Sequence, residues 1–152
     1  MKLQQSEKLR MLRVVLDTNV FISGIKSKKT PPGQILDVWR VQKFVLVTSP
    51  QLLIEIQEVL LRPIILQLLH KTPSDVTAFI QTLYQKSYVT EGNLELTLLS
   101  VDPDDNMILA CAEGGIATHV VTGNKKHFPF MDYKGIKIVS PREFLSELEK
   151  DL

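Results

Sequence analysis

The sequence predicts an α/β protein with a central, mostly parallel sheet of about five strands and helices on both faces. Two observations support this fold class. Short apolar runs rich in Val, Leu and Ile alternate along the chain with longer segments in which apolar residues recur at helical spacing. The runs are apolar at consecutive positions, which is typical of parallel strands buried on both faces. We assign residues 1–12 to a polar lead-in and residues 13–152 to a single domain, in agreement with the length of 152 residues.

Four of these runs are clear strand candidates and a fifth is ambiguous. The clear candidates are residues 13–17, 44–48, 119–122 and 136–139, and residues 94–99 are the ambiguous fifth. The first run, Val14–Leu16, stops at Asp17. Because parallel sheets bind their ligands beyond the carboxyl ends of the strands, Asp17 lies where such a sheet places its functional groups.

Capping residues and apolar stripes predict the helices. Ser49 and Pro50 are an N-cap and a favoured first helical residue, and Pro63 interrupts or ends the helix that they begin. Ser140 and Glu143 have the spacing of a capping box. Helices are predicted over 18–24, 34–42 and 103–113 (the last ending at Gly114-Gly115) and from residues 50, 74 and 141 onward, and residues 26–33 form a basic loop.

Composition excludes several classes of protein. With 18 Lys and Arg against 17 Asp and Glu, the net charge of +1 provides no general attraction to nucleic acid, so any such contact depends on local basic patches. The single cysteine, Cys111, excludes an internal disulfide and fits a reducing compartment. No apolar run reaches the roughly 18 residues of a membrane span, and the first ten residues are too polar for a signal peptide. We therefore expect a cytoplasmic protein without a membrane partner.

Asp17 and Glu55 are the first candidates for a metal site. A carboxylate at the end of a buried strand is costly unless it is hydrogen-bonded, paired or bound to a metal, and the alternative for Asp17 is an N-cap of the next helix. At about 100° per residue, Glu55 lies at the edge of the apolar stripe of its helix and can point along the crevice, whereas Glu58 points to solvent. The alternative for Glu55 is a solvated position beside that stripe.

The acidic cluster DPDD at residues 102–105 is the third candidate. Its alternative is purely structural, because Pro and acids in the first turn favour a helix start and complement the helix dipole. The cluster also follows the ambiguous strand at 94–99 and can therefore reach the same crevice. We expect Asp105 to turn inward and Asp102 to act only as the cap.

Carboxylates from three separate segments repel one another when they converge, and a divalent cation removes that repulsion. Oxygen ligands favour Mg²⁺ or Mn²⁺, and two such ions about 4 Å apart can activate a water and stabilise the leaving oxygen of a phosphodiester. Zinc is not expected, because His70, His119, His127 and Cys111 have no zinc-ligand spacing. Cys111 is expected to pack within a helix.

The segment after the strand at 119–122 is a further candidate. Thr122–Asn124 suits a tight turn that presents a polar side chain over the sheet, and a basic cluster, Lys125, Lys126 and His127, follows it. In the functional interpretation, Asn124 offers an amide to the crevice and the cations bind phosphate. The alternative is an ordinary turn with solvated charges.

Five segments of the chain carry a family resemblance. They are, in order, VVLDTNVFISG, TSPQLLIEIQEVLLRP, DPDDNMILACAEGG, HVVTGNKKHFP and IVSPREFLSEL, within residues 13 to about 148. The chain resembles the PIN domain family, in particular the bacterial and archaeal VapC-like group that forms the toxin components of toxin–antitoxin systems. The resemblance implies a three-layer α/β/α sandwich and a Mg²⁺- or Mn²⁺-dependent endoribonuclease.

The resemblance also implies roles for individual residues. Asp17, Glu55 and Asp105 correspond to the catalytic acids that hold the metal. Asn19 would support Asp17 by a hydrogen bond, and Thr122 would orient the loop that follows it.

The chain departs from the family pattern at Asn124, where the usual residue is Asp. Asparagine can offer a carbonyl oxygen but brings no charge. A further acid that often follows is replaced by the basic segment 125–127. Asp104 or Asp102 would then compensate.

The expected substrate is single-stranded or loop RNA. The expected rim for its phosphates consists of five lysines, which are Lys26, Lys28, Lys29, Lys125 and Lys126. The family further implies an antitoxin that binds over the crevice, and a homodimer.

Two other functions stay open. Asn124 motivates a non-catalytic PIN-fold module that binds RNA or protein. Asp17 at the end of the first strand would also suit an Asp-based phosphatase, but that class requires a second Asp where this chain has Asn19.

Overall fold

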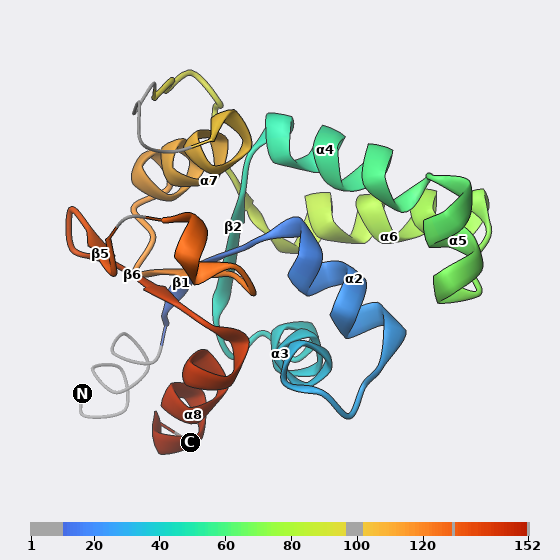
Figure 1. Ribbon diagram of the computed structural model, residues 1–152, viewed down its shortest axis with the longest axis horizontal. Helices are drawn as coiled ribbons and strands as arrows, with labels where there is room; N and C mark the ends of the chain where they lie inside the picture. Colours follow the sequence, from blue (N-terminus) through green and yellow to red (C-terminus); the bar gives the residue numbers. More distant parts are fainter. Residues whose placement is uncertain (1–10, 97–101, 129, 152) are drawn as a thin grey trace.

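The computed structural model describes residues 11–96, 102–128 and 130–151. Its centre is a six-stranded sheet in the order β3-β2-β1-β4-β6-β5, in which every neighbouring pair is parallel except β5 and β6. The strands are β1 (Arg13–Leu16), β2 (Val45–Thr48), β3 (Tyr88–Val89), β4 (His119–Val121), β5 (Asp132–Tyr133) and β6 (Ile136–Val139). The mostly parallel α/β fold that the sequence predicts is therefore confirmed (Figure 1).

Helices cover both faces of the sheet. They are α2 (Thr18–Lys26), α3 (Pro31–Arg40), α4 (Pro50–Leu60), α5 (Pro63–Leu69), α6 (Pro73–Lys86), α7 (Pro103–Gly114) and α8 (Pro141–Asp151), with a short 3-10 helix, η1 (Lys125–His127), after β4. In Figure 1, α7 lies on one side of the sheet, and α2, α3 and α8 lie on the other. No described helix combines the length and the apolar character that crossing a bilayer requires.

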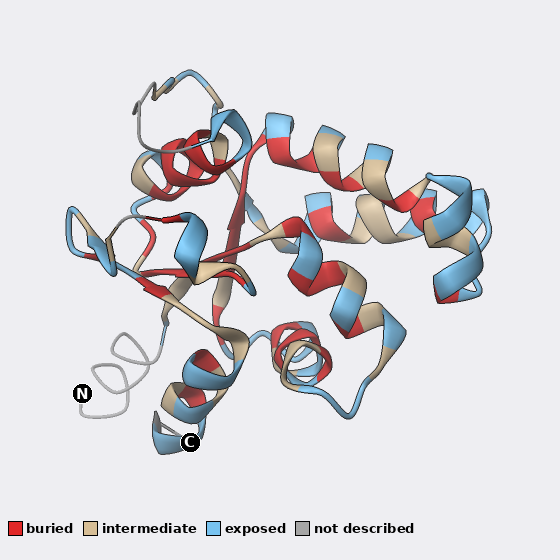
Figure 2. Cartoon of the chain, in the orientation of Figure 1, coloured by how far each residue is buried: buried red, intermediate tan, exposed pale blue. Residues whose placement is uncertain are grey.

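Alternate residues of β1 belong to two separate cores. Val14 and Leu16 pack with α2, α3, α4 and α8, whereas Val15 packs with α7 and β6. All three are at most 2% exposed, so β1 is buried on both faces, as its continuous apolar run predicts. Figure 2 shows the central strands and the inner surfaces of the helices buried, with the exposed residues on the outer surfaces and at the sheet edges. These two cores make the fold a three-layer sandwich.

The predicted caps are present at two helices. Ser49 accepts a hydrogen bond from the Leu52 N–H at 3.1 Å at the start of α4. At the start of α8, the Ser140 N–H donates to Glu143 Oε1 at 3.0 Å and the Glu143 N–H donates to Ser140 Oγ at 3.1 Å, which completes the capping box. Local sequence therefore determines where both helices begin.

Several helix boundaries differ from the prediction, since α2 extends to Lys26 instead of residue 24 and α3 spans Pro31–Arg40 instead of 34–42. Pro63 interrupts the helix as the sequence predicts, because α4 ends at Leu60 and Pro63 is the first residue of α5, where Pro lacks only an N–H that the first helical turn leaves unbonded. The next helix begins one residue earlier than predicted, at Pro73, because Thr72 is its N-cap. The basic loop expected over 26–33 is shorter, because α3 already begins at Pro31.

Two strands of the sheet have no counterpart in the sequence prediction. β3 and β5 contain two residues each, too few to produce an apolar run. β5 joins β6 through a two-residue turn in which Lys134 and Gly135 have φ of 51° and 83°, as a tight hairpin requires. The ambiguous candidate at 94–99 is not a strand over 94–96, and its remainder, like most of the lead-in at 1–12, lies outside the described residues.

The order of the strands reverses at β1. From β1 the chain passes to β2 and β3 on one side, and then returns to β4 and β6 on the other. In open parallel sheets, ligands bind at this switch point, beyond the carboxyl ends of the central strands. Asp17 follows β1 and Thr122 follows β4, and the Asp17 N–H donates to the Val121 carbonyl oxygen at 3.0 Å. The topology thus brings these two residues together.

Helix α7 ends in close contact with β2. A Cβ added at Gly115 would lie 2.3 Å from Val47 Cγ1, whereas a Cβ added at Gly114 would meet nothing within 4 Å. The Arg13 guanidinium, at the start of β1, donates to the Gly115 carbonyl oxygen at 2.7 Å. The two glycines that end the helix therefore differ: Gly115 permits the packing of α7 on β2, and Gly114 takes no part in it.

We expect Gly115→Ala to destabilise the protein by about 1–3 kcal/mol, because its methyl group overpacks a buried contact with a stiff β-branched side chain. Gly114→Ala should be neutral or stabilise by up to about 1 kcal/mol, because Ala is the better helix former. Urea unfolding of the two variants gives the comparison. Equal effects at both positions would contradict the packing assigned to Gly115.

Candidate functional site

A cleft of about 460 Å³ lies at the carboxyl ends of the central strands. Its walls come from the β1–α2 junction, α4, the start of α5, the start of α7 and the loop after β4. Five acids line it, which are Asp17, Glu55, Asp102, Asp104 and Asp105. The cleft thus gathers carboxylates from three segments that are far apart in the sequence.

Asp17 is held in place by Thr122. Thr122 Oγ1 donates to Asp17 Oδ2 at 2.9 Å and accepts from the Asn124 N–H at 3.1 Å, and Thr122 itself is fully buried. Asp17 stands at the N-cap position of α2, but its side chain makes no capping hydrogen bond. The Asp17 carboxylate therefore does not act as a simple helix cap. One hydroxyl instead fixes Asp17 and the loop after β4 relative to each other.

Asn19 lines the cleft but does not make the contact with Asp17 that the resemblance implies. It is exposed at the second position of α2, and among the described residues no hydrogen bond joins its side chain to Asp17. The residue before it faces inward instead: Thr18 Oγ1 donates to Glu55 Oε2 at 2.8 Å. Thr18 and Thr122 therefore provide the hydrogen bonds to the cleft acids.

Glu55 points into the cleft from α4, whereas Glu58, almost one turn further on, is exposed and outside it. Helical spacing predicts this arrangement. Burial raises the pKa of Glu55 above its usual range, and the charges of the cleft aspartates raise it further, while the hydrogen bond from Thr18 opposes the shift. The ionised form of Glu55 is therefore disfavoured by its surroundings in the cleft.

Asp105 is buried, with 7% of its surface exposed. It faces His127, whose Nδ1 lies 3.9 Å from Asp105 Oδ2, too far for a hydrogen bond. Burial raises the pKa of Asp105 and the charge of Asp17 adds to the increase, while His127 opposes it. Asp105 turns inward, as the sequence predicts.

Asp102 stands where the sequence predicts a simple cap. It occupies the N-cap position of α7, but its side chain makes no capping hydrogen bond. One ligand atom from each of Asp102, Asp105 and His127 lies within 4.8 Å of the other two. The sequence prediction places His127 in a basic cluster for phosphate and not among the metal ligands. The signal for it is its position three residues after Asn124, in the stretch where the family pattern carries an acid.

The residues of the cleft fit a divalent cation. Glu55 and Asp105 have raised pKa values because their charges are partly buried and lie near other negative charges. Among the described residues, no donor forms a hydrogen bond with the Asp105 carboxylate. Carboxylate oxygens are the ligands that hard divalent cations prefer, and a cation would convert the mutual repulsion into attraction. The fold therefore contains an acidic cluster suited to such an ion.

The predicted lysine rim is divided between two places. Lys26, Lys28 and Lys29 lie at or beyond the last residue of α2, about 12 Å along the helix axis from its first residue, and none of them lines the cleft. Arg62, which the sequence prediction does not include, lines the cleft from the start of α5. The cationic side chain in the cleft wall is thus an arginine from a different segment.

Lys125 and Lys126 lie on η1, next to the cleft. Lys125 Nζ pairs with Glu143 Oε1 at 2.5 Å. This hydrogen bond, together with those from Ser140, lowers the pKa of Glu143 to about 2. Lys125 therefore joins η1 to the first turn of α8, and Lys126 is exposed.

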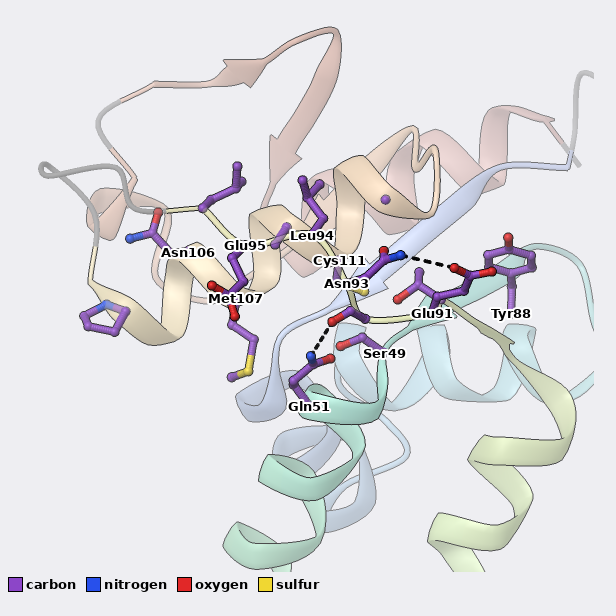
Figure 3. A pocket seen from close by; sticks show the side chains of 16 residues that line it. Ser49, Gln51, Tyr88, Glu91, Asn93, Leu94, Glu95, Asn106, Met107 and Cys111 are labelled. Carbon is purple, nitrogen blue, oxygen red and sulfur yellow. Dashed lines mark hydrogen bonds between the residues drawn. The ribbon is translucent and has the colours of Figure 1, made fainter.

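A second pocket, of about 380 Å³, lies beside the cleft, and Pro103 lines both. Figure 3 shows the side chains around this pocket, with Cys111 of α7 near Ser49. Burial raises the pKa of the Cys111 thiol to about 12. Because only the thiolate is a nucleophile, Cys111 has the packing role that the sequence predicts.

The raised pKa values predict a stability cost in the metal-free protein. Folded Glu55 and Asp105 bind a proton more tightly than they do in the unfolded chain. Their contribution to folding is therefore complete below the usual carboxyl pKa and is lost as the pH rises through the raised values. At pH 7 without metal, we expect Glu55→Gln and Asp105→Asn to raise the melting temperature by a few degrees. Differential scanning calorimetry should show that this gain shrinks at pH 4.

Glu58→Gln, on the exposed side of the same helix, is the matched control and should leave the melting temperature unchanged. Added Mg²⁺ should stabilise the wild type and not the two cleft variants, because only the wild type binds it in the folded state. A lower melting temperature for both cleft variants without metal would contradict the repulsion assigned to these acids.

Comparison with known proteins extends these observations. A sequence model of the PIN domain matches residues 13–126, which include all five acids of the cleft. MJ1680, an uncharacterised protein of Methanocaldococcus jannaschii, is 30% identical over 156 residues, and the alignment covers 97% of this chain and 98% of that protein. The chain is also similar to a crystal structure of DNA-bound VapBC from Salmonella typhimurium, with a TM-score of 0.57 and 22% identity over 86% of this chain and 99% of that chain.

The two kinds of similarity support different conclusions. At 22% identity, the likeness to the solved structure supports the fold. The sequence match covers most of the chain and carries the family assignment. PIN domains are in general nucleases that use divalent metals, in agreement with a hydrolase class and with the acidic cleft. The chain therefore belongs to the PIN domain family.

Proposed function

We propose that residues 13–152 form one Mg²⁺- or Mn²⁺-dependent endoribonuclease domain, the toxin component of a toxin–antitoxin pair. The observation that carries this proposal is the convergence of Asp17, Glu55 and Asp105 on one cleft at the switch point of the sheet. The raised pKa values of Glu55 and Asp105 support it, because perturbed carboxylates gathered in a cleft are typical of functional sites.

In this proposal the three acids hold the cation. Thr18 and Thr122 keep Glu55 and Asp17 in place through hydrogen bonds of 2.8 and 2.9 Å. The chemistry that a divalent cation supplies at such a site is a lower pKa for water and stabilisation of the charge on the phosphate. In the hydrolysis, the water oxygen bonds to phosphorus, the bond from phosphorus to the leaving oxygen breaks, and that oxygen takes up the proton.

Single-stranded or loop RNA is the proposed substrate. Arg62 lines the cleft and the exposed Lys126 lies on η1, so both are suited to contact phosphates. Asn124 brings an uncharged amide to the cleft, and we assign Asp104, at its rim, the supporting negative charge. The three lysines at the far end of α2 would contact only a substrate that extends along that helix.

An antitoxin protein that covers the cleft is the proposed partner, and a homodimer is the proposed assembly. The resemblance of the sequence to VapC-like toxins and the likeness of the fold to VapBC support the antitoxin. Five carboxylates line the cleft, which favours a partner segment that carries Arg. Exposed apolar side chains on α4 and α5, those of Ile54, Ile64 and Leu68, are available for protein contacts.

Asn124 favours a second candidate function, a PIN-fold module that binds RNA or protein without cleaving it. With Asn in place of Asp, the loop after β4 adds no negative charge to the cleft. RNA affinity that EDTA does not change, together with no cleavage of any RNA pool, would support this module. Asp-based phosphatase chemistry has weaker support, because that class requires an acid at the position that Asn19 occupies.

We expect Mn²⁺ to bind the wild type saturably, and Asp17→Asn or Glu55→Gln to lower both Mn²⁺ affinity and RNA cleavage. The loss should be at least about 100-fold, because replacing even an indirect partner of a metal costs about 10–100-fold. Titration calorimetry and a gel assay on a pool of single-stranded RNA provide the two readouts. Glu58→Gln is the control that should retain both activities. Undiminished cleavage by Asp17→Asn would refute the site, and metal binding without cleavage would favour the binding module.

Thr122→Val tests the positioning of Asp17. The substitution conserves shape but removes the hydrogen bond to Asp17 Oδ2, so Mn²⁺ affinity should fall about 10–100-fold in calorimetry. Thr48→Val is the matched control, because Thr48 also ends a central strand, is buried, and has no hydrogen-bond partner for its hydroxyl within the described part of the chain. It should retain wild-type affinity. Wild-type affinity in Thr122→Val would show that Asp17 needs no such support.

A further inference from the structure

We propose that His127 is a metal ligand that acts with Asp102 and Asp105. Its nitrogen makes this part of the metal centre prefer Mn²⁺ to Mg²⁺. The inference rests on the proposed function, because it concerns the same metal centre. One ligand atom of each side chain lies within 4.8 Å of the other two. The three residues come from the start of α7 and from η1, two segments that meet at the cleft.

The carboxylate of Asp105 carries the argument. The residue is 7% exposed, yet within the described ranges no donor hydrogen-bonds to its side chain, although Asp17 and Glu55 each accept a threonine hydroxyl. The Asp105 side chain is 11% exposed, so its carboxylate still reaches the open cleft, where an ion can approach it. His127 Nδ1 is 3.9 Å from Asp105 Oδ2, close to the roughly 3–4 Å between two atoms bound to one ion at bond lengths of about 2.1 Å. An ion contacted by both groups would offset the negative charge of this largely buried carboxylate.

The loop that presents His127 is held at both ends. The His127 N–H donates to the Asn124 carbonyl oxygen at 2.9 Å, and the next residue, Phe128, is buried in the core at 5% exposure. On the other side, Lys125 pairs with Glu143 at 2.5 Å. These neighbours fix the backbone that carries His127, whose imidazole lies 3.9 Å from Asp105 Oδ2 with 46% of its side chain exposed and accessible to an ion.

A nitrogen ligand changes which cation the site favours. Mg²⁺ is bound almost entirely by oxygen, whereas an imidazole nitrogen adds to the affinity for first-row transition ions, among which Mn²⁺ is the weakest binder. Asn124 offers an amide oxygen without charge, so the loop after β4 does not supply the carboxylate that would favour Mg²⁺. We therefore expect the wild type to bind Mn²⁺ at least about tenfold more tightly than Mg²⁺, with His127 responsible for most of that difference.

The test combines titration calorimetry with pulsed electron paramagnetic resonance of Mn²⁺ bound to the full chain. A histidine ligand produces a nitrogen hyperfine coupling that changes when histidine is labelled with ¹⁵N. We expect the coupling in the wild type, its loss in His127→Gln, and a fall in Mn²⁺ affinity of about tenfold or more with Mg²⁺ affinity changed less than about threefold. His70→Gln, which replaces an exposed histidine at the end of α5, is the matched control and should retain the coupling.

A second variant, His127→Asp, restores an all-oxygen set and should move the preference toward Mg²⁺. Because His127 is half exposed, both variants should fold, which circular dichroism verifies. Equal Mn²⁺ affinity in wild type and His127→Gln, without nitrogen coupling, would overturn the inference, and loss of binding in Asp17→Asn would then still support the proposed nuclease site. No Mn²⁺ binding to the wild type would overturn both. Nitrogen coupling without cleavage of any RNA would support His127 as a ligand and count against the nuclease.

Discussion

The hydrogen bond from Thr122 to Asp17 is the contact on which the geometry of the cleft depends. It joins the carboxyl ends of β1 and β4, the two strands at which the sheet order reverses. Helices α4 and α7 then bring Glu55 and Asp105 to the same place from two other segments. These acids repel one another, and the fold keeps them together because β1 is fixed on both faces by buried side chains.

The features that can be predicted from the sequence are those that local patterns determine. Three consecutive apolar residues indicate that β1 is buried on both faces, and Asp17 directly after them marks its functional end. The helical period is enough to separate Glu55, which faces the cleft, from Glu58, which faces solvent. Ser49 and the capping box at Ser140 fix two helix starts through hydrogen bonds between near neighbours. Such patterns give the order of the elements and the position of three cleft acids.

The features that cannot be predicted depend on contacts between distant segments. The strands β3 and β5 are too short to have a pattern of their own, and they exist because β2 and β6 offer edges to pair with. Whether Thr18 or Asn19 faces Glu55 depends on the rotation of α2 about its axis, which packing on α3 and the sheet determines. His127 reaches Asp105 only because the loop after β4 folds back toward α7, and no spacing in the sequence records that approach.

The ion pair between Lys125 and Glu143 has a consequence for the limits of the functional unit. The family match ends at residue 126, and every acid of the cleft precedes that point. Yet Glu143 both accepts the Ser140 N–H that begins α8 and holds η1, while Phe144 anchors the helix in the core. A fragment that ends at residue 126 would keep all the cleft carboxylates but would lose the pairing of Lys125 with Glu143 that holds η1. The smallest autonomous piece with an ordered cleft therefore includes the C-terminal helix.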